Sequence, residues 1–237
     1  MTVNSQPLSV KVIQSLARRG CLNPSSGKRV RVSKEFYKRT FDIVFSATVL
    51  IVFSPLYLII SLLVAISSPG PIFYTQERVG KNFKHFKCIK FRTMVVDADK
   101  VLAKMLAENP EMRKEFEENF KLKNDPRVTP IGRFLRVTSL DEFPQFWNVL
   151  KGDMSVVGPR PLVPEELHKY GNKIYKVLTI KPGITGLWQV SGRNDLPYPQ
   201  RVLIDVYYVN HHNWLLDLWI IIKTIGVILF PHKSGAY

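Results

Sequence analysis

The sequence has little cysteine: only Cys21 and Cys88 occur among its 237 residues. They lie far apart and lack metal-ligand spacing, which argues against a disulfide scaffold and a cysteine-based zinc site. We therefore expect reduced thiols facing a cytoplasm. A signal peptide is not apparent either, because the first residues are polar and the first long apolar run starts only after Arg39.

Acidic residues are also scarce. The chain has 19 Asp and Glu against 34 Lys and Arg, a formal net charge of +15. Such an excess predicts an anionic partner: nucleic acid, an anionic membrane surface or a phosphorylated substrate. The length allows one large domain or two small ones.

Charge is absent from one long segment, Ile43–Ile66. A helix needs about 20 apolar residues to cross a bilayer, so this segment is long enough. Ser54-Pro55 lies in its middle, where proline removes a backbone hydrogen bond and predicts a kink or break. A buried helix of a soluble core is disfavoured, because the segment is apolar on all sides.

The flanks of this segment are both basic, whereas a single span should have one basic flank and one less basic flank. We therefore expect a re-entrant helix that enters the membrane, bends at Ser54-Pro55 and leaves on the same face; a kinked single span is the alternative. The basic residues are Lys28, Arg29, Arg31, Lys34, Lys38 and Arg39 before the segment, and Arg78, Lys81, Lys84, Lys87, Lys90 and Arg92 after it.

The remaining patterns predict a mainly α fold with a small β-hairpin. The hairpin is expected from Ile72 to Phe91 around Gly80-Lys81-Asn82. Asp97–Leu122 is expected to form two helical pieces divided at Asn109-Pro110. Further predictions are helices at 142–150 and 164–179, a loop at 181–186, and either a helix or a strand at 202–210.

The C-terminal run Trp214–Phe230 is short for a span and carries Asp217 and Lys223. Paired tryptophans suit a membrane interface, so we expect an interfacial helix, with a core helix as an equal alternative. The expected organisation is a basic mobile arm over 1–34, a re-entrant membrane helix over 35–68, and a cytoplasmic-face catalytic domain over 69–237 that includes the interfacial helix.

Two adjacent carboxylates, Asp141 and Glu142, stand out in this basic chain. With Ser139 they fit a capping box, in which Ser139 and Glu142 satisfy each other's backbone N–H groups. Capping motifs are common, so these residues alone favour that interpretation. The alternative uses Arg160 in the turn Gly158–Pro161: carboxylates near an arginine in a basic chain suggest metal-assisted handling of a phosphate.

Several motifs follow one another in order along the chain, and together they resemble the bacterial sugar transferase family, the monotopic polyprenyl-phosphate phosphoglycosyl transferases, over about residues 36–237. No array of additional membrane spans precedes Lys38, so the chain resembles the minimal catalytic form with a basic extension. The motifs are KRTFD at 38–42, the Ser54-Pro55 break, GPIFYTQERVG at 70–80, KFRTM at 90–94, LDEFPQ at 140–145, NVLKGDMS at 148–155, GPRP at 158–161, PGITG at 182–186, Gln189-Val190 and GRN at 192–194.

The resemblance implies an enzyme of the bacterial inner membrane, active on its cytoplasmic face. It would transfer a sugar-1-phosphate from a UDP-sugar to polyprenyl phosphate with Mg²⁺ and release UMP, the first membrane step of a surface polysaccharide or glycoconjugate pathway. Asp141 would be the nucleophile, and Glu142 a metal or base partner; both are candidate metal ligands. The expected substrate-binding residues are Lys90, Arg160, Arg136, Arg193 and Gln189.

Two other classes compete with this interpretation. A membrane-tethered nucleic-acid-binding protein would use the same positive charge, but no nucleic-acid motif is recognisable, so we expect no nucleic-acid partner. A scaffold without catalysis is disfavoured by the intact acidic pair, Lys90 and Arg160. The expected partners are the UDP-sugar, the polyprenyl phosphate and the lipid bilayer, with a homodimer or a pathway protein as an open alternative.

Overall fold

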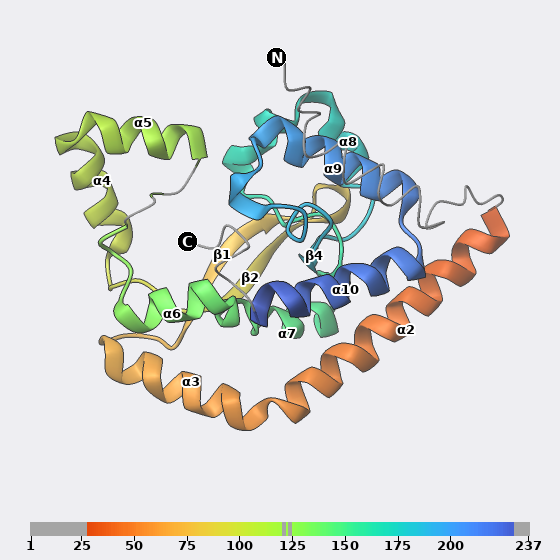
Figure 1. Ribbon diagram of the computed structural model, residues 1–237, viewed down its shortest axis with the longest axis horizontal. Helices are drawn as coiled ribbons and strands as arrows, with labels where there is room; N and C mark the ends of the chain where they lie inside the picture. The colour runs from red at the N-terminus through yellow and green to blue at the C-terminus, as the bar shows by residue number, and fades with distance from the viewer. Residues whose placement is uncertain (1–27, 120–121, 123–124, 230–237) are drawn as a thin grey trace, which may run out of the picture. The chain divides into compact units, whose positions relative to one another are not determined.

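A computed structural model describes residues 28–119, 122 and 125–229 (Figure 1). The described chain divides into two compact units. Unit one comprises 28–52, 75–89 and 144–229, and unit two comprises 53–74, 90–119, 122 and 125–143. Most of it is helical with small sheets, as the sequence predicts. Residues 1–27, most of the predicted mobile arm including Cys21, lie outside the described residues.

The helices are α2 Lys28–Val52, α3 Ser54–Ser67, α4 Ala98–Glu108, α5 Pro110–Asn119, α6 Pro130–Thr138, α7 Gln145–Lys151, α8 Ile174–Val177, α9 Tyr198–His211 and α10 Trp214–Leu229. Short 3₁₀ helices are η1 Lys81–Phe83, η2 Leu140–Glu142, η3 Pro164–Lys173 and η4 Arg193–Asp195. The strands are β1 Phe73–Val79, β2 His85–Phe91, β3 Ser155–Val157 and β4 Gly183–Thr185.

The predicted break in the apolar segment is confirmed. No single helix among the described residues is long and apolar enough to cross a membrane. The segments Glu35–Val52 and Ser54–Ser67 are long and apolar enough when taken together, and the angle between them is 64°. Pro55 falls in the first turn of α3, where its missing N–H costs no hydrogen bond. Large apolar side chains along the pair are exposed, with Ile51 73% and Leu58 72% accessible.

Three polar residues of α2 attach this helix to the rest of unit one. Lys38 and Arg39 each donate hydrogen bonds to other segments of the unit. Asp42 is only 2% exposed and accepts hydrogen bonds from the segment around Ser155. Their side chains thus fix the middle of α2 to the rest of unit one. The partners are Asp217 Oδ2 for Lys38 at 2.6 Å, the Val149 and Leu150 carbonyls for Arg39 at 2.6 and 2.9 Å, and Ser155 Oγ and the Val156 N–H for Asp42, both at 3.0 Å.

The loop predicted at 181–186 is wrong in its centre, because Gly183–Thr185 forms β4 and pairs in parallel with β3. The pairing needs two glycines at close approach: a Cβ on Gly183 would lie 2.1 Å from the backbone N of Gly158. A strand of three residues is too short to show an alternating pattern, which explains the missed strand. This pair holds the turn that carries Arg160.

The segment 164–179 is not the single helix that we predicted. It forms η3 and the short α8, and Gly171 lies between helical turns with φ +49°. The ambiguous segment 202–210 is helical and belongs to α9, which buries Val202, Ile204 and Tyr208. Val202 joins a core cluster of unit one together with Val79, Leu162, Tyr170, Ile174, Val177 and Leu178.

The core of unit two forms where α3 meets the end of β2 and α6. Ile60, Val64, Phe91 and Leu135 are its buried members. The buried Arg92 adds polar contacts, since its guanidinium donates to the carbonyls of Val64 and Ser68 at the C-terminal end of α3 and to that of Pro71 in the segment after it. Carbonyls in the last turn of a helix lack N–H donors from a following turn, so Arg92 supplies donors there and complements the negative end of the helix dipole.

The predicted division of the segment Asp97–Leu122 and the predicted hairpin agree with the structure. The division at Asn109-Pro110 separates α4 from α5, and the Asn109 side chain accepts from the N–H groups of Glu111 and Met112. The hairpin joins β1 to β2 as predicted. In α10 one face is buried through Leu216 and Ile220, whereas Trp214 and Ile222 are 71% and 60% exposed. The core interpretation therefore holds for one face, and the interfacial position of the other stays a prediction.

Candidate active site

The acidic pair lies in η2, immediately after α6, and the capping-box interpretation is wrong. Ser139 ends α6 in the left-handed conformation, with φ +59°, and its side chain makes no capping hydrogen bond. Pro144 delays the next helix, so α7 begins at Gln145 and not at 142. The carboxylates therefore project from a short turn between two helices.

Glu142 pairs with Lys90 from the end of β2. Lys90 Nζ donates to Glu142 Oε1 at 2.6 Å, and the two side chains are 20% and 26% exposed. Both residues belong to unit two, although 52 positions separate them along the chain. The partial exposure leaves this pair within reach of a ligand.

Asp141 is more deeply placed, with 8% of its surface exposed. The pKa of its carboxyl is raised to about 6, mainly by burial. The positive charge of Lys90 lowers this pKa, the neighbouring Glu142 raises it, and the positive charge of Arg136 lowers it. A buried carboxylate beside two cations is the environment in which a functional group acquires a shifted pKa. It remains largely ionised at neutral pH.

Arg136 is held in this cluster from the last turn of α6. Its Nε donates to Thr93 Oγ1 at 3.0 Å. Burial lowers the pKa of Arg136, while the carboxylates of Asp141 and Asp125 raise it. Asp125 itself forms a buried ion pair with Arg127 at 2.6 Å. Unit two thus gathers Lys90, Arg136, Asp141 and Glu142, all of which the sequence predicted as site residues.

Arg160 belongs to unit one and lies in the turn between β3 and η3. The Gly158 N–H donates to the Thr185 carbonyl at 2.9 Å, and the Gly183 N–H donates to Pro159 at 2.8 Å. These bonds lock the GPRP turn against the PGITG loop. The Arg160 guanidinium carbon lies 5.9 Å from the centroid of the Trp188 ring, within range of a cation–π contact.

Two further predicted residues follow Trp188 closely in sequence. Gln189 Nε2 donates to the Ile184 carbonyl at 3.0 Å, which stabilises the loop. Its buried Oε1 has no hydrogen-bond partner among the described residues. The Arg193 N–H donates to the Trp188 carbonyl at 3.3 Å, and Arg193 has φ +47°. Gln189 and Arg193 thus have local structural contacts beside Arg160's loop.

Two residues that act on the predicted ones, Thr93 and Asp205, were not predicted from the sequence. Thr93 holds Arg136, and its place in the KFRTM motif was the available signal. Asp205 is fully buried and accepts from Tyr170 OH at 2.8 Å. Burial raises the pKa of Asp205 to about 7, opposed by the Tyr170 hydrogen bond and by the charge of Arg160. Helical periodicity from Val202 would have placed Asp205 on the buried face of α9.

The described residues contain no group of three or more His, Cys, Asp or Glu side chains placed to hold a metal ion. Asp141 and Glu142 nevertheless offer adjacent carboxylate oxygens on one turn. Mg²⁺ is commonly bound by one or two carboxylates, with substrate phosphates and water as further ligands. The acidic pair therefore offers ligands of the kind that Mg²⁺ takes.

Comparison with known proteins decides the family, because the profile of the bacterial sugar transferases matches residues 33–231. The chain belongs to the bacterial sugar transferase family. This bacterial sugar transferase is 52% identical over 207 residues to the undecaprenyl-phosphate galactose phosphotransferase of Salmonella typhimurium, covering 86% of the chain and 42% of the relative. It is 48% identical over 214 residues to the UDP-galactose-lipid carrier transferase of Erwinia amylovora, covering 90% and 44%.

The transferase thus spans less than half the length of these two curated relatives. A relative of similar size is the exopolysaccharide production protein ExoY of Rhizobium meliloti. The two are 45% identical over 211 residues, which cover 89% of this chain and 93% of ExoY. The family resemblance drawn from the motifs is therefore confirmed.

Proposed function

We propose that this chain transfers a sugar-1-phosphate from a UDP-sugar to undecaprenyl phosphate and releases UMP. Family membership supports the reaction class. The names of relatives support the substrates: besides the Salmonella protein, an Escherichia coli relative 39% identical over 197 residues is a UDP-glucose:undecaprenyl-phosphate glucose-1-phosphate transferase. The ExoY name supports a role in exopolysaccharide production, which a transfer to the lipid carrier would start.

The observation that carries the proposal is the environment of Asp141. A carboxylate that attacks a phosphate must approach a negatively charged centre, so cations have to surround both groups. Lys90 and Arg136 act electrostatically on Asp141 within unit two. The buried carboxylate is thereby poised as a nucleophile whose approach to a phosphoanion is assisted by two fixed cations.

The transfer takes place in two displacement steps. A carboxylate oxygen of Asp141 attacks the β-phosphorus of the UDP-sugar, and the bond from that phosphorus to the bridging oxygen breaks. UMP leaves with the bridging oxygen and its electron pair. A phosphate oxygen of undecaprenyl phosphate then attacks the phosphorus of the aspartyl phosphosugar. The Asp141 carboxylate leaves, and undecaprenyl diphosphate-sugar is released.

The other residues bind and orient the phosphates. Lys90 directs Glu142 through their 2.6 Å ion pair, and Arg136 supplies a guanidinium that Thr93 holds in place. Arg160 is assigned to phosphate binding because guanidinium donors match phosphate oxygens in pairs. Gln189 and Arg193 support the loop that carries Trp188. The positive charge of the chain then serves phosphorylated substrates and a lipid surface, and no nucleic acid.

Magnesium would be held by the carboxylates of Asp141 and Glu142, whose hard oxygen donors suit this ion. When bound, the ion supplies charge neutralisation at the phosphates. Lys90 keeps one oxygen of Glu142 engaged, so the chain itself already balances part of the acidic charge.

The bent helix pair is proposed to enter the membrane and return, with the catalytic part on the cytoplasmic face of the inner membrane. Its exposed apolar side chains and the basic residues on both flanks support this placement. Cysteines introduced at Glu35 and Lys84, in a background without Cys21 and Cys88, should both react with a membrane-impermeant reagent in inverted vesicles, which expose the cytoplasmic side, and neither should react in intact spheroplasts. Labelling of the two positions from opposite sides would show a single span.

The reaction is tested with full-length protein in nanodiscs that contain undecaprenyl phosphate. UMP release is measured with a panel of UDP-sugars that begins with UDP-galactose and UDP-glucose, with and without Mg²⁺. Asp141→Asn should abolish turnover, whereas Asp99→Asn, an exposed acid of the same unit, should not change it. Normal turnover in Asp141→Asn would refute the nucleophile, and no UMP from any UDP-sugar would refute the donor class.

A further inference from the structure

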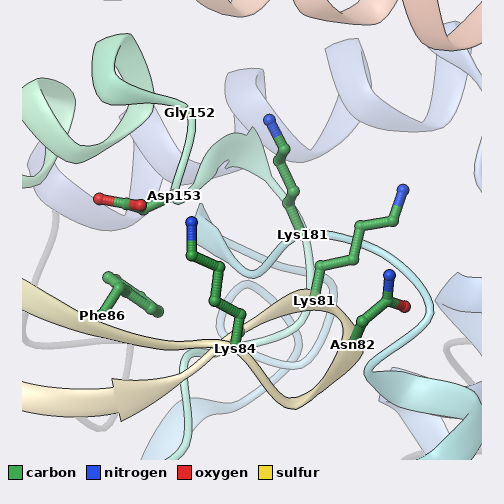
Figure 2. A pocket seen from close by; sticks show the side chains of 8 residues that line it. Lys81, Asn82, Lys84, Phe86, Gly152, Asp153 and Lys181 are labelled. Atoms are coloured by element: carbon green, nitrogen blue, oxygen red, sulfur yellow. The ribbon is translucent and has the colours of Figure 1, made fainter.

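Unit one contains a cavity of about 230 Å³ at the turn of the β-hairpin. Figure 2 shows Lys81 and Lys84 from the hairpin and Lys181 from the loop before β4, all around this cavity. The other lining residues are Gly80, Asn82, Phe86, Gly152 and Asp153. A space of this size is large enough for one phosphate group or a diphosphate.

The charges around the cavity are unbalanced. None of the three lysines forms an ion pair within the part of the chain that the structure describes. The lining carboxylate, Asp153, is directed toward another group, because its Oδ2 accepts from Asn148 Nδ2 at 3.5 Å. Burial lowers the pKa of Lys181, and the positive charges of Arg39 and Lys81 lower it further, although the carboxylates of Asp42 and Asp153 oppose them in part. An anion in the cavity would relieve this repulsion.

The backbone holds the hairpin lysines in place before any ligand arrives. The Gly80 N–H donates to the Lys84 carbonyl at 2.9 Å, and the Lys84 N–H donates back to Lys81 at 3.2 Å. The Asn82 N–H donates to the Leu178 carbonyl at 2.7 Å and fixes the turn to the end of α8. A cationic turn of fixed shape loses little entropy when it binds an anion.

We propose that Lys81, Lys84 and Lys181 form a binding site for a phosphate-bearing anion. Three ammonium groups supply charge-assisted donors from two segments, and the cavity between them is unfilled by side chains. The site does not depend on the proposed transfer reaction, because none of its residues belongs to the acidic cluster of unit two.

Two sources could supply such a phosphate group. One is a soluble nucleotide or inorganic phosphate, and the other is the headgroup of an anionic phospholipid. The recognition chemistry is the same in both cases, since ammonium groups bind phosphate oxygens as point charges. The soluble source and the lipid source are distinguished by offering each kind of phosphate in a separate experiment.

The experiment is lysine footprinting of the full chain in nanodiscs, with acylation at each lysine measured by mass spectrometry. One arm adds inorganic pyrophosphate to nanodiscs of a zwitterionic lipid. The other arm uses nanodiscs that contain phosphatidylglycerol without pyrophosphate. The exposed Lys173 and Lys176 of the same unit serve as internal controls. Acylation of Lys81, Lys84 and Lys181 should fall severalfold in at least one arm, with the control lysines unchanged.

A variant tests whether the three lysines act together. Lys181→Gln should raise the ligand concentration needed for half-maximal protection of Lys81 and Lys84 about tenfold, as expected for loss of a charged donor. The double variant Lys173→Gln/Lys176→Gln should leave it unchanged. Protection only by pyrophosphate assigns a soluble ligand, and protection only by phosphatidylglycerol assigns a headgroup. Equal acylation with and without both ligands, or protection that Lys181→Gln leaves intact, would overturn the proposal.

Discussion

Lys90 Nζ and Glu142 Oε1 lie 2.6 Å apart and join the end of β2 to the turn that carries the acidic pair. The same ammonium opposes the rise in the pKa of Asp141 that burial causes. One lysine thus acts on both carboxylates: it pairs with the more exposed one and stabilises the charged form of the buried one. This relationship makes the acidic pair a cluster with an unequal division of charge, and its consequences are measurable.

The first prediction concerns the pH dependence of turnover. The pKa of Asp141 is raised to about 6, and a nucleophilic carboxylate must be ionised. We therefore expect kcat/KM for the UDP-sugar to rise about tenfold per pH unit below pH 6 and to level off above it. The apparent pKa belongs to the acidic pair as a whole. A profile that stays flat from pH 5 to 8 would contradict the role of Asp141.

The second prediction concerns Lys90→Met. Loss of the ammonium removes a charge that lowers the pKa of Asp141, so the acidic limb of the kcat/KM profile should move to higher pH. The plateau should also fall, by roughly a hundredfold, because an electrostatic contact to the phosphates is lost. Lys87→Met, at an exposed position of the same strand, is the matched control. An unchanged limb in Lys90→Met would show that the ion pair is only structural.

Local sequence patterns were sufficient for the parts of this fold that depend on neighbouring residues. The Ser54-Pro55 break, the hairpin around Gly80-Lys81-Asn82 and the division at Asn109-Pro110 all follow from backbone chemistry that acts over a few positions. The residues of the acidic cluster were identified through ordered motifs, since the carboxylates by themselves favoured a helix cap.

Contacts between distant segments could not be predicted in this way. Lys90 pairs with Glu142 over 52 positions, and Ser155 anchors Asp42 over 113 positions. The parallel register of β3 and β4 joins two strands that are too short to show a pattern. The capping box failed for a related reason. Ser139 takes a left-handed conformation because it ends α6, and that ending depends on how α6 packs.

The third prediction concerns stability. The folded chain keeps a proton on Asp141 up to about pH 6, whereas the unfolded chain releases it near the lower, ordinary pKa. Stability therefore falls as pH rises through this window, and the loss is complete above pH 6. Asp141→Asn removes the buried charge and should stabilise the protein by about 1–3 kcal/mol at pH 8. The two proteins should differ little at pH 4.

Thermal unfolding in detergent at the two pH values measures this effect. Asp99→Asn is the control, because its carboxylate is exposed in the first turn of α4 and should contribute less than about 1 kcal/mol at either pH. A lower melting temperature for Asp141→Asn at pH 8 would mean that the ionised carboxylate stabilises the fold, contrary to the burial argument. An inactive but more stable variant would show that this site sacrifices stability for reactivity.

The last prediction concerns Gly132, which lets α6 approach the end of β2. A Cβ at this position would lie 2.0 Å from the Thr93 carbonyl oxygen. Both elements belong to the same unit, and the Thr93 hydroxyl holds Arg136. Gly132→Ala should therefore cost about 1–3 kcal/mol of stability. It should also lower turnover, because a shift of Thr93 moves Arg136 relative to Asp141.

Gly226→Ala is the matched control, since a Cβ at that helical position would meet no atom within 4 Å among the described residues, apart from its chain neighbours and the backbone of its own helix. Alanine forms helix better than glycine by about 1 kcal/mol, so this variant should be as stable as the parent or slightly more stable. Melting temperature and UMP release are measured for both variants. If Gly132→Ala has the same melting temperature and the same rate of UMP release as Gly226→Ala, close contact between α6 and the strand end does not set the position of Arg136. A stable Gly132→Ala protein with reduced turnover would instead locate the whole effect in the acidic cluster.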